Sequence, residues 1–352
     1  MKTQRQVRQE VRVRDIVIGG TAPITVQSMT NTDTRDVAAT IAQIQQLQQA
    51  GCEIVRLAVL NSQAAAALPQ IRQKVDLPLV ADIHFDYRLA LAAIAAGFDK
   101  LRLNPGNMGD RGQIRQVAQA AKAAGVPIRI GINSASLEKE LLHTYGGATP
   151  EAMVASALKH IAYLEAEDFN DIIVSLKAPD LPRTVAAYRL MAAACHYPLH
   201  IGITHAGSPQ RGIITSAAGL AILLAEGLGD TLRVSLTGDP VTEVETGWRI
   251  LASLELREYG VRLISCPTCG RCQVDLAALV TQVEELLLGY QGPVQSVAVM
   301  GCEVNGPGEA QEVDLGIAAG QGMGLIFRRG EVVAKVAPQE LLTEFRKYLQ
   351  GF

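Results

Sequence analysis

Two kinds of segment alternate along residues 15–258: short runs rich in Ile, Val and Leu, and longer runs rich in Ala, Leu and Gln. The short runs are typical of buried strands and the longer runs of helices. Strands are expected at Ile24–Met29, Ile54–Leu60, Pro78–Phe85, Lys100–Asn104, Pro127–Asn133, Asp171–Lys177, Leu199–Thr204 and Thr231–Thr237. Helices are expected between them, among others at Asp36–Ala50, Gly112–Ala124, Pro150–Ala166, Leu181–Cys195, Ile213–Ala225 and Val241–Leu256.

Three of the helical runs end in the same way, with alanine followed by glycine at 50–51, 96–97 and 124–125. Glycine can adopt the left-handed conformation that ends a helix and releases the next strand. This weak repeat of one β/α unit, at about eight units in roughly 250 residues, predicts an α/β fold of the (β/α)8 TIM-barrel type. A doubly wound open sheet is the alternative, but the sequence has no early Gly-x-Gly-x-x-Gly motif to favour it.

The last part of the chain follows a different pattern. We expect residues 1–260 to form the barrel and bind the substrate, and residues 261–352 to form a small α+β domain around the cysteines. The elements expected in this second domain are a helix at Asp275–Leu288, strands at Val294–Met300, Gly324–Arg328 and Glu331–Lys335, and a terminal helix at Pro338–Leu349.

The composition narrows the class of protein. Hydrophobic residues make up 48% of the 352 residues and charged residues 19%, which predicts a folded chain with a large core. A net charge of −3 argues against general binding to nucleic acid or to a membrane surface. The sequence has no apolar run long enough for a transmembrane helix, and its charged N-terminus is unlike a secretory signal. Four of the six cysteines lie within residues 266–302, which favours a metal site in a reducing compartment, the cytoplasm.

Polar residues interrupt the predicted strands, although the strands of a parallel barrel are buried on both faces and should be apolar. They recur at 82 and 84, 102 and 104, 129 and 133, 175 and 177, and 233 and 235, so each strand sends its polar side chains to one face near its carboxyl end. In a barrel, that end carries the active site. The cations expected there are Arg56, Arg102, Arg129, Lys177 and Arg233.

These positive charges would repel one another at one barrel mouth unless an anion bound between them. Guanidinium groups bind phosphate oxygens in a fork, so the pattern predicts a substrate with phosphate or diphosphate groups. The competing explanation is that internal carboxylates neutralise the arginines, and Asp82 is the main candidate. His84 and His205 also stand at the ends of predicted strands, where a histidine could bind substrate or act in catalysis.

The cysteines near residue 270 have the spacing of a metal site. Cys266, Cys269 and Cys272 form a C-x-x-C-x-x-C motif, and Cys302 follows in a loop rich in Gly and Pro. The spacing alone fits an iron–sulfur cluster held by all four cysteines, and it fits a zinc site with four thiolates equally well. Glu309, in the same loop as Cys302, could ligate iron, act as an acid or be a surface carboxylate.

These motifs resemble those of the 4-hydroxy-3-methylbut-2-en-1-yl diphosphate synthase (GcpE/IspG) family in its short bacterial form. The resemblance extends over nearly the whole chain. The similar cysteine motifs are Ser265–Arg271 (SCPTCGR) and Gly301–Glu309 (GCEVNGPGE). The other similar segments are Val26–Thr32, Asp82–Phe85, Arg102–Asn107 and Arg233–Thr237.

The resemblance implies a cofactor and a substrate. The cofactor is a [4Fe-4S] cluster, and Cys272 is not among its ligands. The substrate is 2-C-methyl-D-erythritol 2,4-cyclodiphosphate, which is opened and dehydrated by two electrons to 4-hydroxy-3-methylbut-2-enyl diphosphate on the methylerythritol phosphate route to isoprenoids. The implied cluster ligands are Cys266, Cys269, Cys302 and Glu309. The implied substrate-binding residues are Arg56, His84, Arg102, Asn104, Asn107, Arg129, Asn133, Lys177, Arg233 and Ser235.

The resemblance also implies partners and catalytic residues. Flavodoxin or ferredoxin would supply the electrons, and two chains would form a homodimer whose active sites are shared between subunits. The catalytic residues expected are Glu309, His205 and Asp82. Residue 205 departs from the family, because the segment 202–207 reads Gly-Ile-Thr-His-Ala-Gly where the family has glutamate in place of histidine. A histidine there could also donate a proton.

Two other functions are compatible with the same residues. One is a non-redox barrel enzyme that acts on a phosphorylated substrate and has a structural zinc site at its cysteines. The other is a sensor that keeps the cluster but has lost turnover because of His205.

Overall fold

Parallel strands form the inner layer of the first part of the chain. The computed structural model describes residues 5–103, 111–204, 208–272, 274–302, 308, 311–320 and 322–352. It divides the chain into two compact units, Met1–Arg257 and Glu258–Phe352. The strands of the first unit are β3 (Thr25–Met29), β4 (Ile54–Ala58), β5 (Leu79–Ile83), β6 (Lys100–Leu103), β7 (Ile128–Asn133), β8 (Ile172–Lys177), β9 (His200–Ile201) and β10 (Thr231–Leu232).

These strands close into a ring. Within the described residues, eight strands are hydrogen-bonded in the order β8-β7-β6-β5-β4-β3-β10-β9, and all the pairs are parallel. A parallel bridge between Val174 and Leu199 joins β8 to the residues that lead into β9. The predicted (β/α)8 barrel is therefore confirmed, with each strand directing its carboxyl end to the same mouth.

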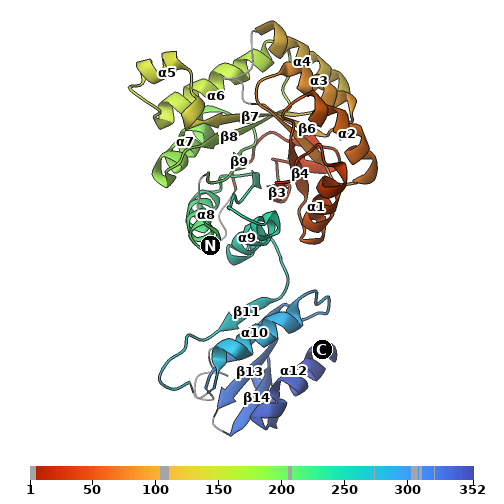
Figure 1. Cartoon of the computed structure of the whole chain (residues 1–352). Coiled ribbons are helices and arrows are strands. Elements are labelled where there is room, and N and C mark those ends of the chain that lie inside the picture. The colour runs from red at the N-terminus through yellow and green to blue at the C-terminus, as the bar shows by residue number, and fades with distance from the viewer. Residues whose placement is uncertain are drawn as a thin grey trace. The chain divides into compact units, whose positions relative to one another are not determined.

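Helices form an outer layer around the barrel strands (Figure 1). They are α1 (Val37–Gln49), α2 (Ser62–Lys74), α3 (Tyr87–Ala95), α4 (Arg111–Ala124), α5 (Lys139–Thr144), α6 (Pro150–Glu165), α7 (Leu181–Ala194), α8 (Pro209–Ala225) and α9 (Pro240–Ser253). The side chain of an Asp, Asn or Thr accepts a hydrogen bond at the start of most of them, as Asp36 does for α1 and Asp180 for α7. The glycines at 51, 97 and 125 follow helices with φ of +89°, +79° and +65°, as the repeat predicted. In the part of the chain that is described, every helix is too short or too polar to cross a membrane.

Two strands are shorter than the sequence predicts. β9 and β10 have two residues each, where six and seven residues were expected to be extended. Beyond Leu232, the Arg233 N–H still donates to Ile201 O, but the Leu236 N–H donates to the carboxylate of Glu243 on α9 and not to a neighbouring strand. The chain therefore leaves the barrel as soon as it reaches the polar residues of the mouth.

A hairpin that the sequence did not predict packs at the other end of the barrel. β1 (Val11–Val13) and β2 (Ile16–Ile18) are antiparallel. Val11, Val13 and Ile18 form one apolar cluster with Ile54, Val80 and Ile173, which lie at or near the first residues of β4, β5 and β8. The hairpin therefore closes the amino-terminal end of the barrel and leaves the carboxyl end as the open mouth.

In its described residues, the second unit is a sheet with two α-helices. The strands are β11 (Arg262–Ser265), β12 (Ser296–Met300), β13 (Leu315–Gly320), β14 (Met323–Arg328) and β15 (Glu331–Val336), hydrogen-bonded in chain order. β11, β12 and β13 are parallel, whereas β14 and β15 are antiparallel to their neighbours. α10 (Leu276–Leu287) and α12 (Leu341–Gln350) pack on one face, in an apolar core with β12 and β13. β13 was not predicted because its sequence, LGIAAG, is poor in β-branched residues.

We predict that the hairpin plug stabilises the barrel. Replacing Val13, which is fully buried, by alanine removes two methyl groups from the cluster and should lower the free energy of unfolding by about 2 kcal/mol. The same change at Val7, which is 74% exposed, should have almost no effect. Urea unfolding followed by circular dichroism measures both variants, and equal effects at the two positions would show that the plug adds nothing.

Candidate active site

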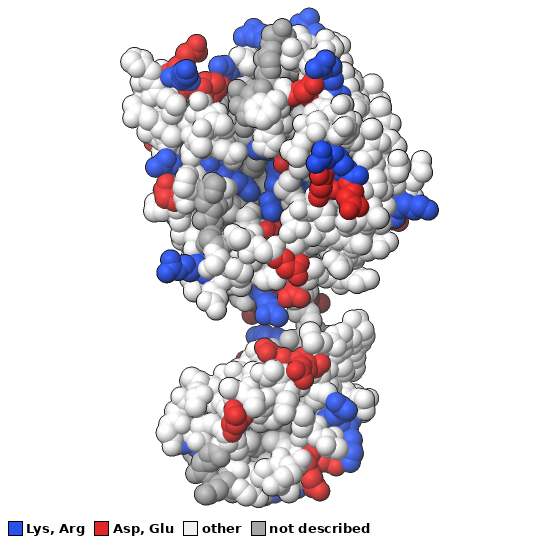
Figure 2. All heavy atoms as spheres, viewed as in Figure 1, with Lys and Arg blue, Asp and Glu red and all other residues white. Residues whose placement is uncertain are grey.

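The barrel mouth collects the cations that the sequence predicted. Arg56 on β4, Arg102 on β6 and Arg129 on β7 are almost fully buried, with 8%, 5% and 1% of their surface exposed. Lys177 is the last residue of β8, and Arg233 follows β10. Figure 2 shows Lys and Arg atoms in a hollow of the barrel unit, with Asp and Glu atoms nearby.

Asp82, at the end of β5, binds one group of these cations. Its Oδ1 accepts from Arg102 Nη1 at 3.1 Å, and its Oδ2 lies 3.8 Å from Arg56 Nε. His84 Nε2 is 3.5 Å from Oδ2 and 2.8 Å from Arg102 Nη1. Burial acts to raise the pKa of Asp82, but Arg56, the hydrogen bond with His84 and Arg102 outweigh it and hold this pKa well below its usual range. Asp82 is thus a carboxylate at neutral pH and has no proton to donate.

Glu243 binds the second group, and the sequence analysis missed it. Its carboxylate accepts three contacts from Arg233: from Nε at 3.1 Å and from Nη2 at 3.1 and 3.0 Å. It also accepts from Ser28 Oγ and from the Leu236 N–H, both at 2.9 Å. Glu243 lies in the first turn of α9, where an acidic residue is common because it interacts favourably with the helix dipole. The signal for an internal role was its position on the buried face of α9, four residues before Gly247 and eight before Leu251.

Two cations of the mouth, Arg129 and Lys177, form no ion pair with a carboxylate among the described residues. Arg129 Nε and Nη1 are buried without a hydrogen-bond partner. Burial lowers the pKa of Arg129 well below its usual value, and the nearby Arg56 and Arg102 lower it further. Burial and the same neighbours, together with Arg233, likewise lower the pKa of Lys177. Positive charge here is therefore unfavourable until an anion binds.

Two glycines leave room for these side chains. A Cβ at Gly131 would lie 2.7 Å from Arg102 Nε. A Cβ at Gly202 would lie 2.6 Å from the carbonyl oxygen of Arg233 and 3.2 Å from Lys177 Nζ. Both contacts are closer than van der Waals packing permits, so the backbone of β7 and the residue after β9 are part of the binding geometry.

The remaining predicted residues fall into two groups. Asn133, at the end of β7, and Ser235, three residues after β10, are half-buried on the side of the barrel where the cations lie. Asn104, Asn107, His205 and Glu309 lie outside the described residues.

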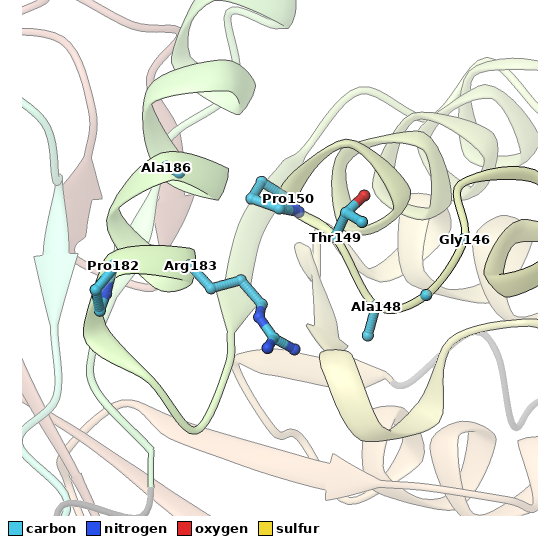
Figure 3. A pocket seen from close by; sticks show the side chains of 8 residues that line it. Gly146, Ala148, Thr149, Pro150, Pro182, Arg183 and Ala186 are labelled. Carbon is cyan, nitrogen blue, oxygen red and sulfur yellow. The ribbon is translucent and has the colours of Figure 1, made fainter.

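A separate pocket of about 500 Å³ opens to solvent beside α6 and α7 (Figure 3). It is lined by residues 146–150 and by Pro182, Arg183 and Ala186. Its charged residue, Arg183, is already paired with Asp180 at 3.1 Å, and none of the predicted site residues lines it. The predicted site residues of the barrel unit that the structure describes therefore lie outside this pocket.

Four of the six cysteines lie in the second unit, and two of them follow the ends of adjacent strands. Cys266 follows β11 and Cys302 follows β12, and these strands are parallel neighbours. The Gly301 N–H donates to Cys266 Sγ at 3.2 Å. Cys272 differs, because its own thiol donates to Val274 O at 3.3 Å. Cys269 is exposed, and Cys266, Cys272 and Cys302 are half-buried.

The donor set fits an iron–sulfur cluster in its chemistry. Thiolate ligands accept hydrogen bonds from backbone N–H groups, as Cys266 does, and such bonds tune the potential of a cluster. Within the described ranges, which leave out Glu309, no three His, Cys, Asp or Glu side chains are close enough together to hold a single metal ion. The strand ends thus bring two of the predicted ligand positions, Cys266 and Cys302, near each other.

Taken together, the fold and the site define a (β/α)8-barrel protein with a cationic mouth and an additional α+β unit that contains cysteines. The family models give the same division: the GcpE TIM-barrel domain matches residues 8–248, and the GcpE protein C-terminal domain matches residues 262–351. The chain belongs to the GcpE family.

Close relatives carry one name, 4-hydroxy-3-methylbut-2-en-1-yl diphosphate synthase (flavodoxin). The relative from Nitratidesulfovibrio vulgaris is 57% identical, and the alignment covers 100% of this chain and 91% of the relative. The relative from Ruminiclostridium cellulolyticum is 54% identical over 97% of this chain and 96% of its own length. These matches confirm the family resemblance drawn from the motifs.

Solved structures support the barrel alone. Yersinia pestis dihydropteroate synthase aligns with a TM-score of 0.51 at 15% identity and covers 70% of this chain and 99% of its own. An N-acetylneuraminic acid synthetase from Leptospira borgpetersenii aligns with a TM-score of 0.51 at 12% identity, covering 80% of this chain and 98% of its own. At such identities the likeness concerns the fold and not the activity.

We predict that an anion can take over the role of Asp82. Asp82→Asn leaves Arg56 and Arg102 without their counter-charge and should lower the free energy of unfolding at pH 7 by roughly 3–5 kcal/mol. Inorganic diphosphate should restore a large part of that loss. Because the pKa of Asp82 is lower in the folded than in the unfolded chain, its contribution is present above about pH 4 and disappears as the pH falls further.

Thermal unfolding with and without about 10 mM diphosphate measures this effect, because a ligand in excess over its Kd raises the stability of the folded state. The matched control is Asp99→Asn, which breaks the 2.7 Å ion pair with Arg72; Asp99 directly precedes β6, at the end of the strand opposite the mouth. Diphosphate should not rescue that variant. Equal rescue of both variants would mean that diphosphate does not act at the mouth.

Proposed function

We propose that the chain converts 2-C-methyl-D-erythritol 2,4-cyclodiphosphate to 4-hydroxy-3-methylbut-2-enyl diphosphate. The substrate takes up two electrons and two protons, its carbon–oxygen bond to the ring phosphate breaks, and one water leaves. The names of the relatives support this reaction, and with it a place for the chain in isoprenoid biosynthesis.

The observation that carries the proposal is the unbalanced charge at the barrel mouth. Among the described residues, five cations converge there and only Asp82 and Glu243 oppose them. The full set of these cations is Arg56, Arg102, Arg129, Lys177 and Arg233. A diphosphate group supplies the missing negative charge and enough oxygens to accept from several guanidinium groups.

Each residue of the mouth then has a role in binding. Arg129 and Lys177, which lack a carboxylate partner, bind the diphosphate directly, and Arg56, Arg102 and Arg233 complete its surroundings. Asp82 remains ionised and balances the charge of Arg56 and Arg102 instead of transferring a proton. His84, held between Asp82 and Arg102, faces the same site from the end of β5. The asparagines at 104, 107 and 133 and Ser235 are further proposed contacts.

The cysteines are proposed to hold a [4Fe-4S] cluster, which would supply electrons one at a time and a Lewis-acidic iron for the oxygen that leaves. Cys266, Cys269, Cys302 and Glu309 are the proposed ligands. Cys272 is left out because the family resemblance does not place it among the ligands, and its Sγ instead contacts Val274 O at 3.3 Å. Cys266 already accepts a hydrogen bond, as a thiolate ligand would.

Partners follow from the same proposal. The relatives' name specifies flavodoxin, so flavodoxin is the first electron donor to test, with ferredoxin as the second. A homodimer would combine the barrel of one subunit with the cysteine unit of the other. The relatives do not favour the zinc-containing non-redox enzyme or the sensor, because their shared name is that of a reductive synthase.

The metal content tests the cofactor and the reaction together. Purified without oxygen, the protein should contain iron and acid-labile sulfide and should form product with reduced flavodoxin. Cys266→Ala and Cys302→Ser should lose iron and turnover, because each removes a thiolate ligand. Cys272→Ala should keep the iron and sulfide content of the unchanged protein. Zinc without iron, or loss of iron in Cys272→Ala alone, would contradict the proposed ligand set.

We predict that His205 transfers a proton to the substrate, in place of the family's glutamate. His205→Ala should reduce kcat by roughly 10²–10⁴-fold, the usual contribution of a general acid. His205→Glu should recover much of the rate and shift the pH profile towards acid, since a carboxyl group titrates below an imidazole. Steady-state rates between pH 5.5 and 8.5 (about the range in which His and Glu change charge) measure both effects. Full activity of the alanine variant would rule out this role.

A further inference from the structure

Glu243 contributes an unusually complete set of hydrogen bonds to the barrel mouth. With 4% of its surface exposed, it accepts from Ser28 on β3, from Arg233 after β10 and from the backbone of Leu236. Three segments of the chain therefore meet on one carboxylate. A buried carboxylate with all its acceptor sites filled is held in a single conformation, and it holds its partners in turn.

The contact with Arg233 uses one edge of the guanidinium. Nε and Nη2 donate to the Glu243 oxygens at 3.0 to 3.1 Å, which is the bidentate geometry of a strong ion pair. Among the described residues, the other amino group, Nη1, has Met29 Sδ at 3.9 Å as its one hydrogen-bond partner. A thioether is a weak acceptor, so Nη1 can still bind a better one.

A stronger acceptor would lie near Met29 Sδ, because a second arginine also directs its donors at this sulfur atom. Arg56 Nε and Nη2 are 3.1 and 3.0 Å from Met29 Sδ, so two arginines from opposite sides of β3 direct their donors at one weak acceptor. A phosphate oxygen is a far stronger partner for a guanidinium than a thioether sulfur. The free edge of Arg233 is therefore aimed at a place suited to an oxygen of the substrate.

We propose that Glu243 is a positioning residue that fixes Arg233 with its Nη1 directed towards Arg56, and that this arrangement sets the affinity for the diphosphate group. An arginine side chain loses much conformational freedom when it binds an anion, and a side chain fixed in advance has already lost it. Glu243 touches no reacting atom in this account. The inference rests on the proposed function, because it assumes that a diphosphate occupies the mouth.

Charge and position make opposite predictions for Glu243→Gln. The variant removes a negative charge beside the anion site, so electrostatics alone would strengthen diphosphate binding. Loss of the fork releases Arg233, so positioning predicts weaker binding. A purely structural role would lower the melting temperature and leave the affinity unchanged. The sign of the change in Kd thus separates the three explanations.

The experiment is a calorimetric titration of the full-length protein with inorganic diphosphate. We expect Kd to rise at least about 10-fold in Glu243→Gln, a factor that corresponds to one lost charge-assisted hydrogen bond. Glu243→Asp keeps the charge but is one methylene too short to reach both Arg233 and Leu236, and it should also raise Kd. With the cyclodiphosphate, both variants should raise KM more than they lower kcat. Glu243→Asp alone decides the matter if Glu243→Gln does not fold.

Glu53→Gln is the matched control. Glu53 also accepts from a backbone N–H, that of Val26 at 2.7 Å, and from an arginine, Arg257 at 3.1 Å, but it precedes β4 at the closed end of the barrel. Its Kd should stay within about 2-fold of the unchanged protein, since it is far from the anion. Unchanged or tighter binding in the Glu243 variants, or equal weakening in Glu53→Gln, would overturn the inference. Failure of the unchanged protein to bind diphosphate would overturn the proposed substrate as well.

Discussion

Buried positive charge at the carboxyl ends of the barrel strands is the constraint on which the rest of the site depends. Burying a guanidinium is costly unless it is paired, and here three arginines, on β4, β6 and β7, are at least nine-tenths buried. Two glycines make room for the cationic residues: a Cβ at Gly131 or Gly202 would collide with Arg102, Lys177 or the Arg233 carbonyl. The hairpin closes the opposite end with an apolar plug, so the mouth is the end at which charge can gather. One end of the barrel is thus closed by apolar side chains and the other is lined by charged ones, and the anion site lies at the charged end.

The sequence was sufficient to predict the barrel because each β/α unit carries its own signals. The strands of the first six units begin and end within about two residues of their expected bounds, and the glycines at 51, 97 and 125 end helices with positive φ. The last strand was overestimated for a physical reason: the Leu236 N–H donates to the Glu243 side chain on α9, and a strand pattern cannot reveal a bond from the backbone to a side chain. The hairpin at 11–18 was missed because its strands have three residues each, too few for alternation to stand out. The Gly- and Ala-rich β13 was missed because burial on both faces, and not propensity, makes it a strand.

The arginines of the site could be found from sequence because they break an apolar pattern, whereas their partners could not. Arg56, Arg102 and Arg129 each stand inside a run of aliphatic residues, where a charge needs a reason. Glu243 stands among polar residues at the start of a helix, where an acidic residue is common and indicates no special role. Only the fold brings it to Arg233, ten positions back in the chain, and to Ser28 on β3. The cysteines show the same limit. Their spacing indicates a metal site, but the parallel pairing of β11 with β12, which places Cys266 beside Gly301, depends on a strand that the sequence pattern did not reveal.

The two carboxylates of the mouth differ in geometry, and the difference suits different tasks. Asp82 is shared among Arg102, Arg56 and His84 at 3.1, 3.8 and 3.5 Å, so it lowers the energy of several positive groups without fixing any of them in two places. Glu243 is committed to one guanidinium through both of its oxygens, and Ser28 and Leu236 prevent it from turning. A shared carboxylate can be replaced by another anion, because it contributes charge. A carboxylate such as Glu243, which binds one guanidinium through both oxygens, cannot be replaced in this way, because it fixes the orientation of the Arg233 side chain. An anion site that has both can be stable when empty and still present a fixed donor to its ligand, which is what preorganised binding of a diphosphate requires.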